Sequence, residues 1–381
     1  MKVLISCGEP SGDMYAGALA REIHALDRSA DVFGMGGNWF HEGGGRLEAD
    51  YRGLAVTGLS EALRVIPRSL TLYHRLVKLA KAERPDVFVP IDFPDFNFRL
   101  ASTLKRLGIP VVYYVCPQVW AWRRRRLFSI KRFAAQALVI FKFEEELYRE
   151  AGIPVQFVGH PLIDICKPEP IRDVIHRAIN FDPTKPTVAL FPGSRQNEVR
   201  AILPDLVKAA SLIALRLPGV QFLIARAPNL ADDIFNSLSD LSELPHTVAV
   251  FEARSEEVLS SCDVVVTASG TATVQTAIHG RPMVIVYRLS PLTYRLIRKF
   301  VHVDAIGMVN LIAGEKVSPE LIQDEFTPSA VAAEVLKFFE NDSYVEHTRS
   351  KLKQVCMQLG TPGASRRAAE AVVAAANNSL Q

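Results

Sequence analysis

Residues 2–23 read KVLISCGEPSGDMYAGALAREI: a short apolar run, a loop, and then apolar positions spaced about every 3.6 residues. The apolar run predicts a buried strand, and the later pattern predicts a helix. The glycines of the loop allow another backbone to approach closely, and Ser11 or Asp13 can cap the helix. Glu9 is needed for neither purpose. The loop is therefore either a capped connection or a loop that presents a carboxylate to a ligand.

The same order of strand, loop and helix recurs along the chain. Candidate strands are apolar runs at 3–7, 31–37, 86–92, 111–115, 137–140 and 155–159 in the first half, and at 187–194, 220–227, 247–253, 263–270 and 282–288 in the second. Helical patterns lie between them, for example at 14–26 and 98–108. This alternation is typical of parallel α/β sheets, and it favours two consecutive doubly wound halves over one very wide sheet.

We therefore predict an α/β fold with two Rossmann-like domains, at 1–162 and 163–345. The prolines of GHPLIDICKPEPIRD, residues 159–173, mark a hinge between them. A C-terminal helical segment at 346–381 is free to pack on either domain, and we assign it to the first.

Composition limits the classes of function. The chain has 381 residues, 49% of them hydrophobic and 22% charged, and a net charge of +3, which is too small to indicate a nucleic-acid partner by itself. Its five cysteines are scattered and form no CxxC pair, so we expect reduced thiols without zinc or a disulfide framework. The apolar run before Gly8 is too short for a signal peptide, and no run of about 20 apolar residues occurs. We expect a cytoplasmic protein without a membrane span.

DVFVPIDFPDFNF, residues 86–98, is the sharpest candidate for chemistry. Asp92 falls at the end of a strand hydrophobic enough to be central, and the loop adds Asp95 and Asn97. A carboxylate beside phenylalanines can have a raised pKa and act as a general base. Capping of the next helix explains Asp95 or Asn97 better than it explains Asp92. We favour Asp92 as the base.

Two loops of the second half are suited to an anion. FPGSRQNEV places Gly193, Ser194 and Arg195 between a strand and a helix, and ASGTAT places Gly270, Thr271 and Thr273 in the same position. Backbone N–H groups, helix dipoles and one guanidinium can together bind a nucleotide diphosphate. Neither loop is a P-loop, and no DxD motif is present. We expect neither a metal nor a cofactor at this site.

Two further segments carry arginines beside apolar residues. VWAWRRRR, residues 119–126, has two tryptophans before four arginines, and residues near 59–76 interleave leucines with arginines. The simplest interpretation of the first segment is a solvated helix face, and that of the second is a pair of amphipathic helices covering the sheet. An acidic lipid surface or a phosphorylated substrate is the alternative, and nucleic acid is the weakest of the options.

Taken together and in this order, the motifs GEPSGD, PDVFVPIDFPDFN, YYVCPQVWAWR, FVGHPL, FPGSR, ASGTAT and NLIAG resemble the lipid-A-disaccharide synthase family. The resemblance covers nearly the whole chain. It implies a GT-B glycosyltransferase fold, in which two Rossmann-like domains face each other across a cleft. It also implies that UDP-2,3-diacylglucosamine and 2,3-diacylglucosamine 1-phosphate (lipid X) react to give UDP and a β-1,6-linked disaccharide 1-phosphate, a precursor of lipid A.

The resemblance assigns roles to particular residues. Asp92 matches the family's proposed base, and the first domain would bind the acceptor while the second binds the UDP-sugar. The acceptor residues it implies are Glu9, Ser11, Asp13, Asp95, Trp120 and Arg123. The UDP residues it implies are Gly193, Ser194, Arg195, Gly270, Thr271, Thr273, Gln275, Arg288 and Asn310. Gln275 stands where the family often has a glutamate that holds the ribose, so the charge-assisted part of that contact is lost.

Other interpretations stay open. A UDP-N-acetylglucosamine 2-epimerase or a peptidoglycan N-acetylglucosaminyltransferase shares the fold and the nucleotide end, whereas VWAWR and the segment near 59–76 favour a lipid substrate. A non-catalytic peripheral protein that binds UDP-sugars or acidic lipids is the alternative of another class. The implied partners are the two substrates and an anionic membrane surface, with peripheral attachment at the inner membrane; the chain is a monomer or a homodimer.

Overall fold

The computed structural model describes residues 1–54, 59–117, 125–228, 230, 235, 248–289 and 305–378, with side chains from residue 65 onward in the helix that begins at Leu59. These residues form two compact units. Unit 1 comprises Met1–Ile165 together with Leu359–Gln381, and unit 2 comprises the described residues from Cys166 to Gln358. Within the described residues, the chain passes from unit 1 to unit 2 after Ile165 and returns to unit 1 at Leu359.

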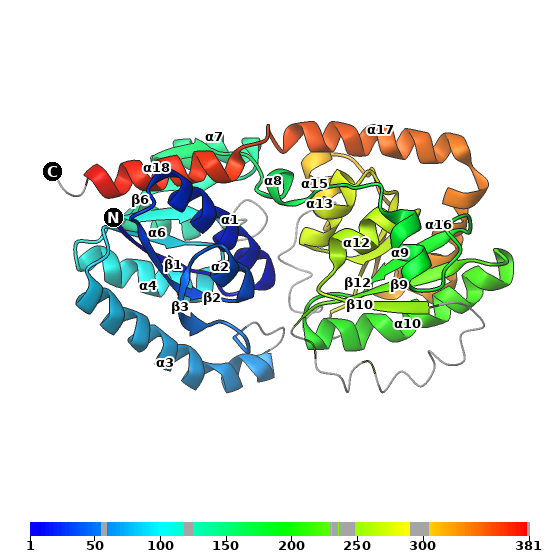
Figure 1. Cartoon of the computed structure of the whole chain (residues 1–381), viewed down its shortest axis with the longest axis horizontal. Helices are drawn as coiled ribbons and strands as arrows, with labels where there is room; N and C mark the ends of the chain where they lie inside the picture. The colour runs from blue at the N-terminus through cyan, green and yellow to red at the C-terminus, as the bar shows by residue number, and fades with distance from the viewer. Residues whose placement is uncertain are drawn as a thin grey trace. The chain divides into compact units, whose positions relative to one another are not determined.

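Unit 1 contains a parallel sheet in the order β3-β2-β1-β4-β5-β6-β7 (Figure 1). Its strands are β1 (Lys2–Ser6), β2 (Asp31–Gly36), β3 (Arg46–Asp50), β4 (Val87–Pro90), β5 (Val111–Tyr114), β6 (Ala134–Val139) and β7 (Val155–Phe157). The central strands β1, β4 and β5 are apolar and buried on both faces, as parallel strands covered by helices must be. Strand order reverses between β1 and β4, which makes this point the topological switch of the sheet.

Helices cover both faces of this sheet. They are α1 (Pro10–Leu26), α2 (Asn38–Glu42), α3 (Leu59–Glu83), α4 (Pro94–Arg106), α6 (Arg126–Phe133), α7 (Lys142–Glu150), α8 (Leu162–Ile165) and α18 (Ala364–Asn378). The last of them lies along α1 (Figure 1). Asp164 holds its start, because the carboxylate accepts hydrogen bonds from the backbone N–H groups of Gly363 and Ser365 at 2.6 and 2.8 Å.

Unit 2 repeats the plan with a parallel sheet in the order β10-β9-β8-β11-β12-β13. Its strands are β8 (Thr187–Phe191), β9 (Gln221–Arg226), β10 (Val248–Glu252), β11 (Val264–Ala268), β12 (Met283–Tyr287) and β13 (Glu320–Ile322). Its helices are α9 (Arg172–Ala178), α10 (Gln196–Arg216), α12 (Ser255–Ser261), α13 (Thr271–Ile278), α15 (Met308–Ala313), α16 (Pro328–Glu340) and α17 (Asp342–Gln358), with a 3₁₀ turn, η2, at Gln323–Glu325. The switch point lies between β8 and β11, and the main core packs α10 and α16 against the strands.

Three local expectations were wrong. The first helix begins at Pro10, not after Asp13, so Ser11 and Asp13 lie inside its first turn and Glu9 is its N-cap. The helix after Asp92 begins at Pro94 with Phe93 as its N-cap, so neither Asp95 nor Asn97 caps it. Residues 59–83 form one helix with Pro67 inside it, where the pattern suggested a pair.

The described residues contain no helix that combines the length and the apolar character needed to span a bilayer.

Candidate functional site

Two loops meet at the switch point of unit 1, because β1 and β4 are paired neighbours. A Cβ added at Gly8 would collide with the ring of Phe93, so only glycine lets the loop after β1 pack against the loop after β4. Ser6 Oγ donates a hydrogen bond to Asn97 Oδ1 at 2.7 Å, and this bond ties the end of β1 to α4. The GEPSGD loop therefore packs against the segment that follows β4 and is not an isolated turn.

Asp92 occupies a strained position in this junction. Its φ is 44°, and that of Phe93 is 50°. Two consecutive non-glycine residues in the left-handed region cost about 1–3 kcal/mol each, and such strain gathers at functional sites. The Asp92 carbonyl oxygen accepts hydrogen bonds from Asn97 Nδ2 at 2.8 Å and from the Tyr113 hydroxyl at 2.9 Å. The backbone of this half-buried carboxylate is therefore fixed from two neighbouring elements.

Asp95 has a different environment. Its side chain is 83% exposed and forms an ion pair with Arg126 at the start of α6. The Asp95 carboxylate is therefore engaged by Arg126 at the surface, whereas Asp92 lies half-buried where β4 ends.

The other residues expected in the first loop divide into two groups. Glu9 and Ser11 are half-buried at the start of α1, and the Glu9 side chain makes no capping hydrogen bond within the described part of the chain. Asp13 is buried beneath them and accepts three backbone hydrogen bonds from the loop and first turn of α2. Burial raises the pKa of Asp13, and these three bonds oppose the shift. Asp13 therefore ties the start of α1 to the loop and first turn of α2. Trp120 and Arg123 lie outside the described residues.

In unit 2 the PGSR loop follows β8 at the switch point. Gly193 has a φ of 124°, and a Cβ there would collide with the Glu198 carboxylate. Arg195 is the N-cap of α10, and Glu198 Oε2 accepts the Ser194 N–H at 3.1 Å. The Glu198 carboxylate thus already accepts a hydrogen bond from one of the N–H donors of this loop. Sequence reasoning missed Glu198, although a glutamate in the first turn of a helix is the usual signal for such a contact.

The second loop follows β11, the neighbour of β8. Gly270 is the N-cap of α13, its φ is 151°, and a Cβ there would meet no atom of the described residues within 4 Å. Thr273 Oγ1 donates to the Gly270 carbonyl at 2.8 Å, and Thr271 begins the helix. The start of α13 is therefore open, and its N–H groups can receive an anion.

Two other expected UDP residues are already bonded to groups of unit 2. Asn310 makes all four hydrogen bonds an amide allows, to Ser318, Val317 and Glu320. Arg288 pairs with Asp205 and donates to the carbonyls of Ala201 and Phe326.

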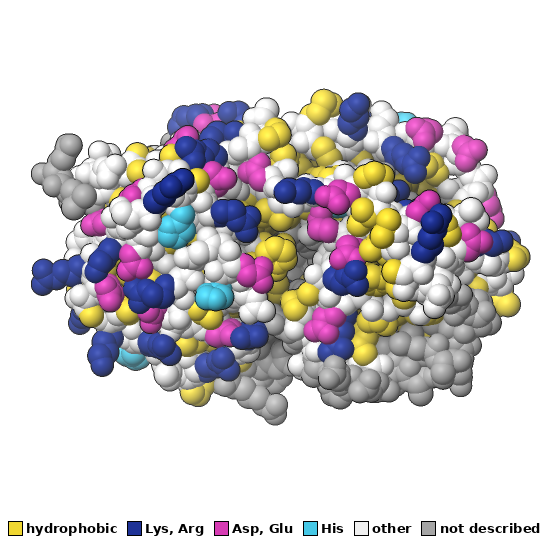
Figure 2. All heavy atoms as spheres, in the orientation of Figure 1, with side chains coloured by type: hydrophobic (Ala, Val, Ile, Leu, Met, Phe, Trp, Pro, Cys, Tyr) yellow, Lys and Arg dark blue, Asp and Glu magenta, His cyan; other side chains and the backbone are white. Residues whose placement is uncertain are grey.

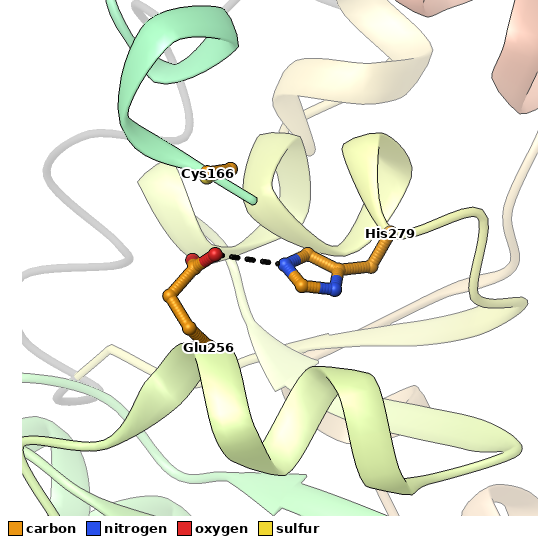
Figure 3. A group of neighbouring side chains, drawn as sticks. All are labelled: Cys166, Glu256 and His279. Carbon is orange, nitrogen blue, oxygen red and sulfur yellow. Dashed lines mark hydrogen bonds and ion pairs between the residues drawn. The ribbon is translucent and has the colours of Figure 1, made fainter. Parts of the chain in front are cut away.

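Gln275 is buried in α13, and its side chain lies beside the Cys166 thiol. Burial and the nearby Glu256 carboxylate raise the pKa of this thiol, and the contact with Gln275 opposes part of the shift. Its neighbours Cys166, Glu256 and His279 form the group of described residues that has the donor atoms for a metal ion (Figure 3).

Comparison with known proteins gives a consistent answer. A family model described as lipid-A-disaccharide synthetase matches residues 3–375. The lipid-A-disaccharide synthase of Trichlorobacter lovleyi is 39% identical over 372 residues, which are 98% of this chain and 97% of that protein. That of Geobacter metallireducens is 40% identical over 378 residues (98% and 96%), and that of Coxiella burnetii strain Dugway is 39% identical over 370 residues (97% and 97%).

Solved structures share the fold at low identity. UDP-GlcNAc 2-epimerase from Neisseria meningitidis, bound to UDP-GlcNAc, has a TM-score of 0.69 at 14% identity and covers 98% of this chain and 100% of its own. The glycosyltransferase of kitacinnamycin has a TM-score of 0.61 at 18% identity, over 98% and 97%. These likenesses confirm two Rossmann-like domains of the GT-B kind and do not separate an epimerase from a transferase. The sequence matches make that separation: the chain belongs to the lipid-A-disaccharide synthetase family.

Proposed function

We propose that this chain is an inverting glycosyltransferase that transfers 2,3-diacylglucosamine from UDP to the 6-hydroxyl of 2,3-diacylglucosamine 1-phosphate. The products are UDP and the β-1,6-linked disaccharide 1-phosphate. Family membership supplies the reaction class. The observation that carries the mechanism is Asp92, a carboxylate held in a strained backbone conformation at the switch point of unit 1.

The stereochemistry requires a single displacement. A UDP-sugar has an α linkage, so a β product forms when the acceptor oxygen attacks C1 from the opposite face. Asp92 takes the proton of the 6-hydroxyl as the new C–O bond forms, and the C1–O bond to UDP breaks at the same time. One base is sufficient for this reaction, and a second carboxylate nucleophile has no role in it.

The leaving group requires positive potential in unit 2. The open start of α13 and the guanidinium of Arg195, at the start of α10, supply it for the departing diphosphate. Because Glu198 already accepts the Ser194 N–H, we assign the larger share of diphosphate binding to the α13 loop. Acceptor binding belongs to unit 1, where Glu9 and Ser11 flank the loop that packs against Phe93.

The acyl chains of the substrates imply contact with a membrane surface, and α3 has the required character. Ile66 and Leu70 are exposed on it at 48% and 38%, and Arg68 and Arg75 are exposed near them. Leu72 and Leu76 on the same helix are buried, so the exposed pair is not part of the core. Figure 2 shows basic side chains along the edge of unit 1 where Figure 1 places α3. We propose that this face touches anionic lipid.

The test of the reaction is turnover of UDP-2,3-diacylglucosamine and lipid X in detergent micelles. Asp92→Asn should lower kcat about 10²–10⁴-fold, because the variant cannot accept the proton, while UDP binding stays unchanged. Asp95→Asn is the matched control, since it makes the same chemical change three residues away, and it should retain most activity. Full activity in Asp92→Asn would move the base elsewhere. UDP binding without any disaccharide from the wild type would contradict the proposed transfer.

A further inference from the structure

Three side chains with metal-binding atoms converge in unit 2. Cys166 follows α8, Glu256 lies in the first turn of α12, and His279 ends α13 (Figure 3). One ligand atom from each lies within 4.8 Å of the other two, and Glu256 Oε2 is 3.0 Å from His279 Nε2. The three residues come from three separate segments, so no local turn accounts for their meeting.

The group is mostly buried, and its three side chains already contact one another. Cys166 is 4% exposed and the side chain of His279 is 1% exposed, whereas the side chain of Glu256 is 36% exposed. The Glu256 carboxylate bonds to His279 and lies within hydrogen-bonding reach of the Cys166 thiol. Its Oε1 is buried, and no hydrogen bond of normal geometry reaches it from the described residues. Such oxygens are uncommon in native proteins, and a cation between the three side chains would satisfy this one.

Neighbouring groups orient the ligand atoms. Ser260 Oγ lies 3.5 Å from His279 Nδ1, and this contact leaves Nε2 facing the group. The backbone N–H of Lys167 donates to Glu256 Oε2 at 3.0 Å. Second contacts of this kind, which fix the ring and the carboxylate, are a regular part of metal sites in proteins.

We propose that Cys166, Glu256 and His279 bind one zinc ion. A thiolate, an imidazole and a carboxylate are all zinc ligands, whereas magnesium and calcium prefer oxygen alone. Bonds of about 2.0–2.3 Å place tetrahedral zinc ligands about 3.3–3.8 Å apart, so small side-chain movements close the site. Zinc would occupy the space between the Glu256 and His279 atoms, and water would complete the coordination.

The proposed ion is structural and takes no part in glycosyl transfer. It would join the segment where the chain enters unit 2 to α12 and α13, and α13 begins at the proposed diphosphate loop. Sequence reasoning excluded zinc because no two cysteines are paired. The ligands are instead scattered along the chain, and only the fold brings them together.

Direct metal binding tests the proposal. The full-length protein is stripped with a chelator and titrated with Zn²⁺, and in parallel with Co²⁺, whose bond to a thiolate gives a near-ultraviolet charge-transfer band. We expect stoichiometric zinc and the cobalt–thiolate band in the wild type. Cys166→Ser should lose the band, and Glu256→Gln and His279→Asn should bind zinc much more weakly.

Two matched controls exclude general effects of the substitutions. Cys116→Ser removes an equally buried cysteine from unit 1, and Glu257→Gln changes the residue next to Glu256. Both should bind zinc as the wild type does. A wild type without stoichiometric zinc, or a Cys166→Ser protein that keeps both the zinc and the band, would overturn the proposal. If Cys166→Ser does not fold, the nearly isosteric Glu256→Gln decides the question by its zinc affinity.

Discussion

His160 lies between Tyr15 and Phe141 in unit 1, and its ring is fully enclosed. Burial lowers the pKa of His160 to about 3, and its Nδ1 accepts the backbone N–H of Leu162 at 3.2 Å. That bond requires an unprotonated Nδ1. The GHPL motif therefore uses its histidine as a neutral packing residue.

This histidine makes the stability of unit 1 depend on pH. Its pKa is lower in the folded state than the unfolded value of about 6.5, so the unfolded chain binds the proton first as pH falls. The contribution is fully present above about pH 6.5 and is lost toward pH 3, at about 1.4 kcal/mol per pH unit. Urea unfolding between about pH 7 and pH 4 should show a shallower pH slope for His160→Asn than for the wild type. His41→Asn, at an exposed histidine, is the control, and equal slopes for wild type and His160→Asn would refute the account.

Arg195 gives a second prediction at this scale. A charge-assisted hydrogen bond to a diphosphate contributes about 1.5–3 kcal/mol, so Arg195→Gln should weaken UDP binding about 10- to 100-fold. Titration calorimetry with UDP measures this directly. Arg200→Gln alters an exposed arginine of the same helix and should leave the affinity unchanged. Equal affinities for the two variants would remove Arg195 from the nucleotide site.

At the scale of secondary-structure elements, the exposed face of α3 predicts lipid binding. Ile66→Ser with Leu70→Ser should reduce co-sedimentation with anionic vesicles, because the apolar contact is lost while the arginines remain. Leu215→Ser, at a leucine of α10 that is 74% exposed, is the matched control. Undiminished sedimentation of the double variant would rule out this face as the lipid contact.

Strand prediction worked where burial is strong. All the apolar runs expected to be strands are strands, because central parallel strands are apolar on both faces. β3 and β13 were missed: RLEAD is polar and lies at an edge, and β13 has only three residues. The starts of α1 and α4 were predicted too late along the chain. Each of these helices begins with a proline, and proline is compatible with the first position of a helix.

At the scale of the whole molecule, the sequence predicted two doubly wound domains. Asp92 and the two glycine loops of unit 2 were chosen as candidates because each follows a strand, and the structure places those strands beside the switch points. The functions of Asp13, Arg288 and Asn310 could not be read in this way. The polar atoms of Asp13 and Arg288 bond to groups far away in sequence, and those of Asn310 bond to the segment that follows its helix, so only the folded chain identifies the partners.

The return of the chain to unit 1 gives a prediction at this scale. α18 packs on α1, and its residues Ala368, Ala369 and Val372 are buried. Val372→Ala should lower the stability of unit 1 by about 2 kcal/mol and increase hydrogen exchange in α1. Exchange in α10 of unit 2 should not change. Asn377→Ala, at an exposed position of the same helix, is the control, and unchanged exchange in α1 of the Val372→Ala protein would contradict the prediction.

The late position of α18 also affects the protein during its synthesis. Unit 1 lacks one of its covering helices until α18 leaves the ribosome, and unit 2 is made in between. At a translation rate of about 5–20 residues per second, that interval lasts about 10–40 s. Throughout it, the face of α1 that later binds α18 is exposed on the nascent chain. Unit 1 is therefore begun before unit 2 and completed after it, and during this interval the nascent chain needs protection from aggregation.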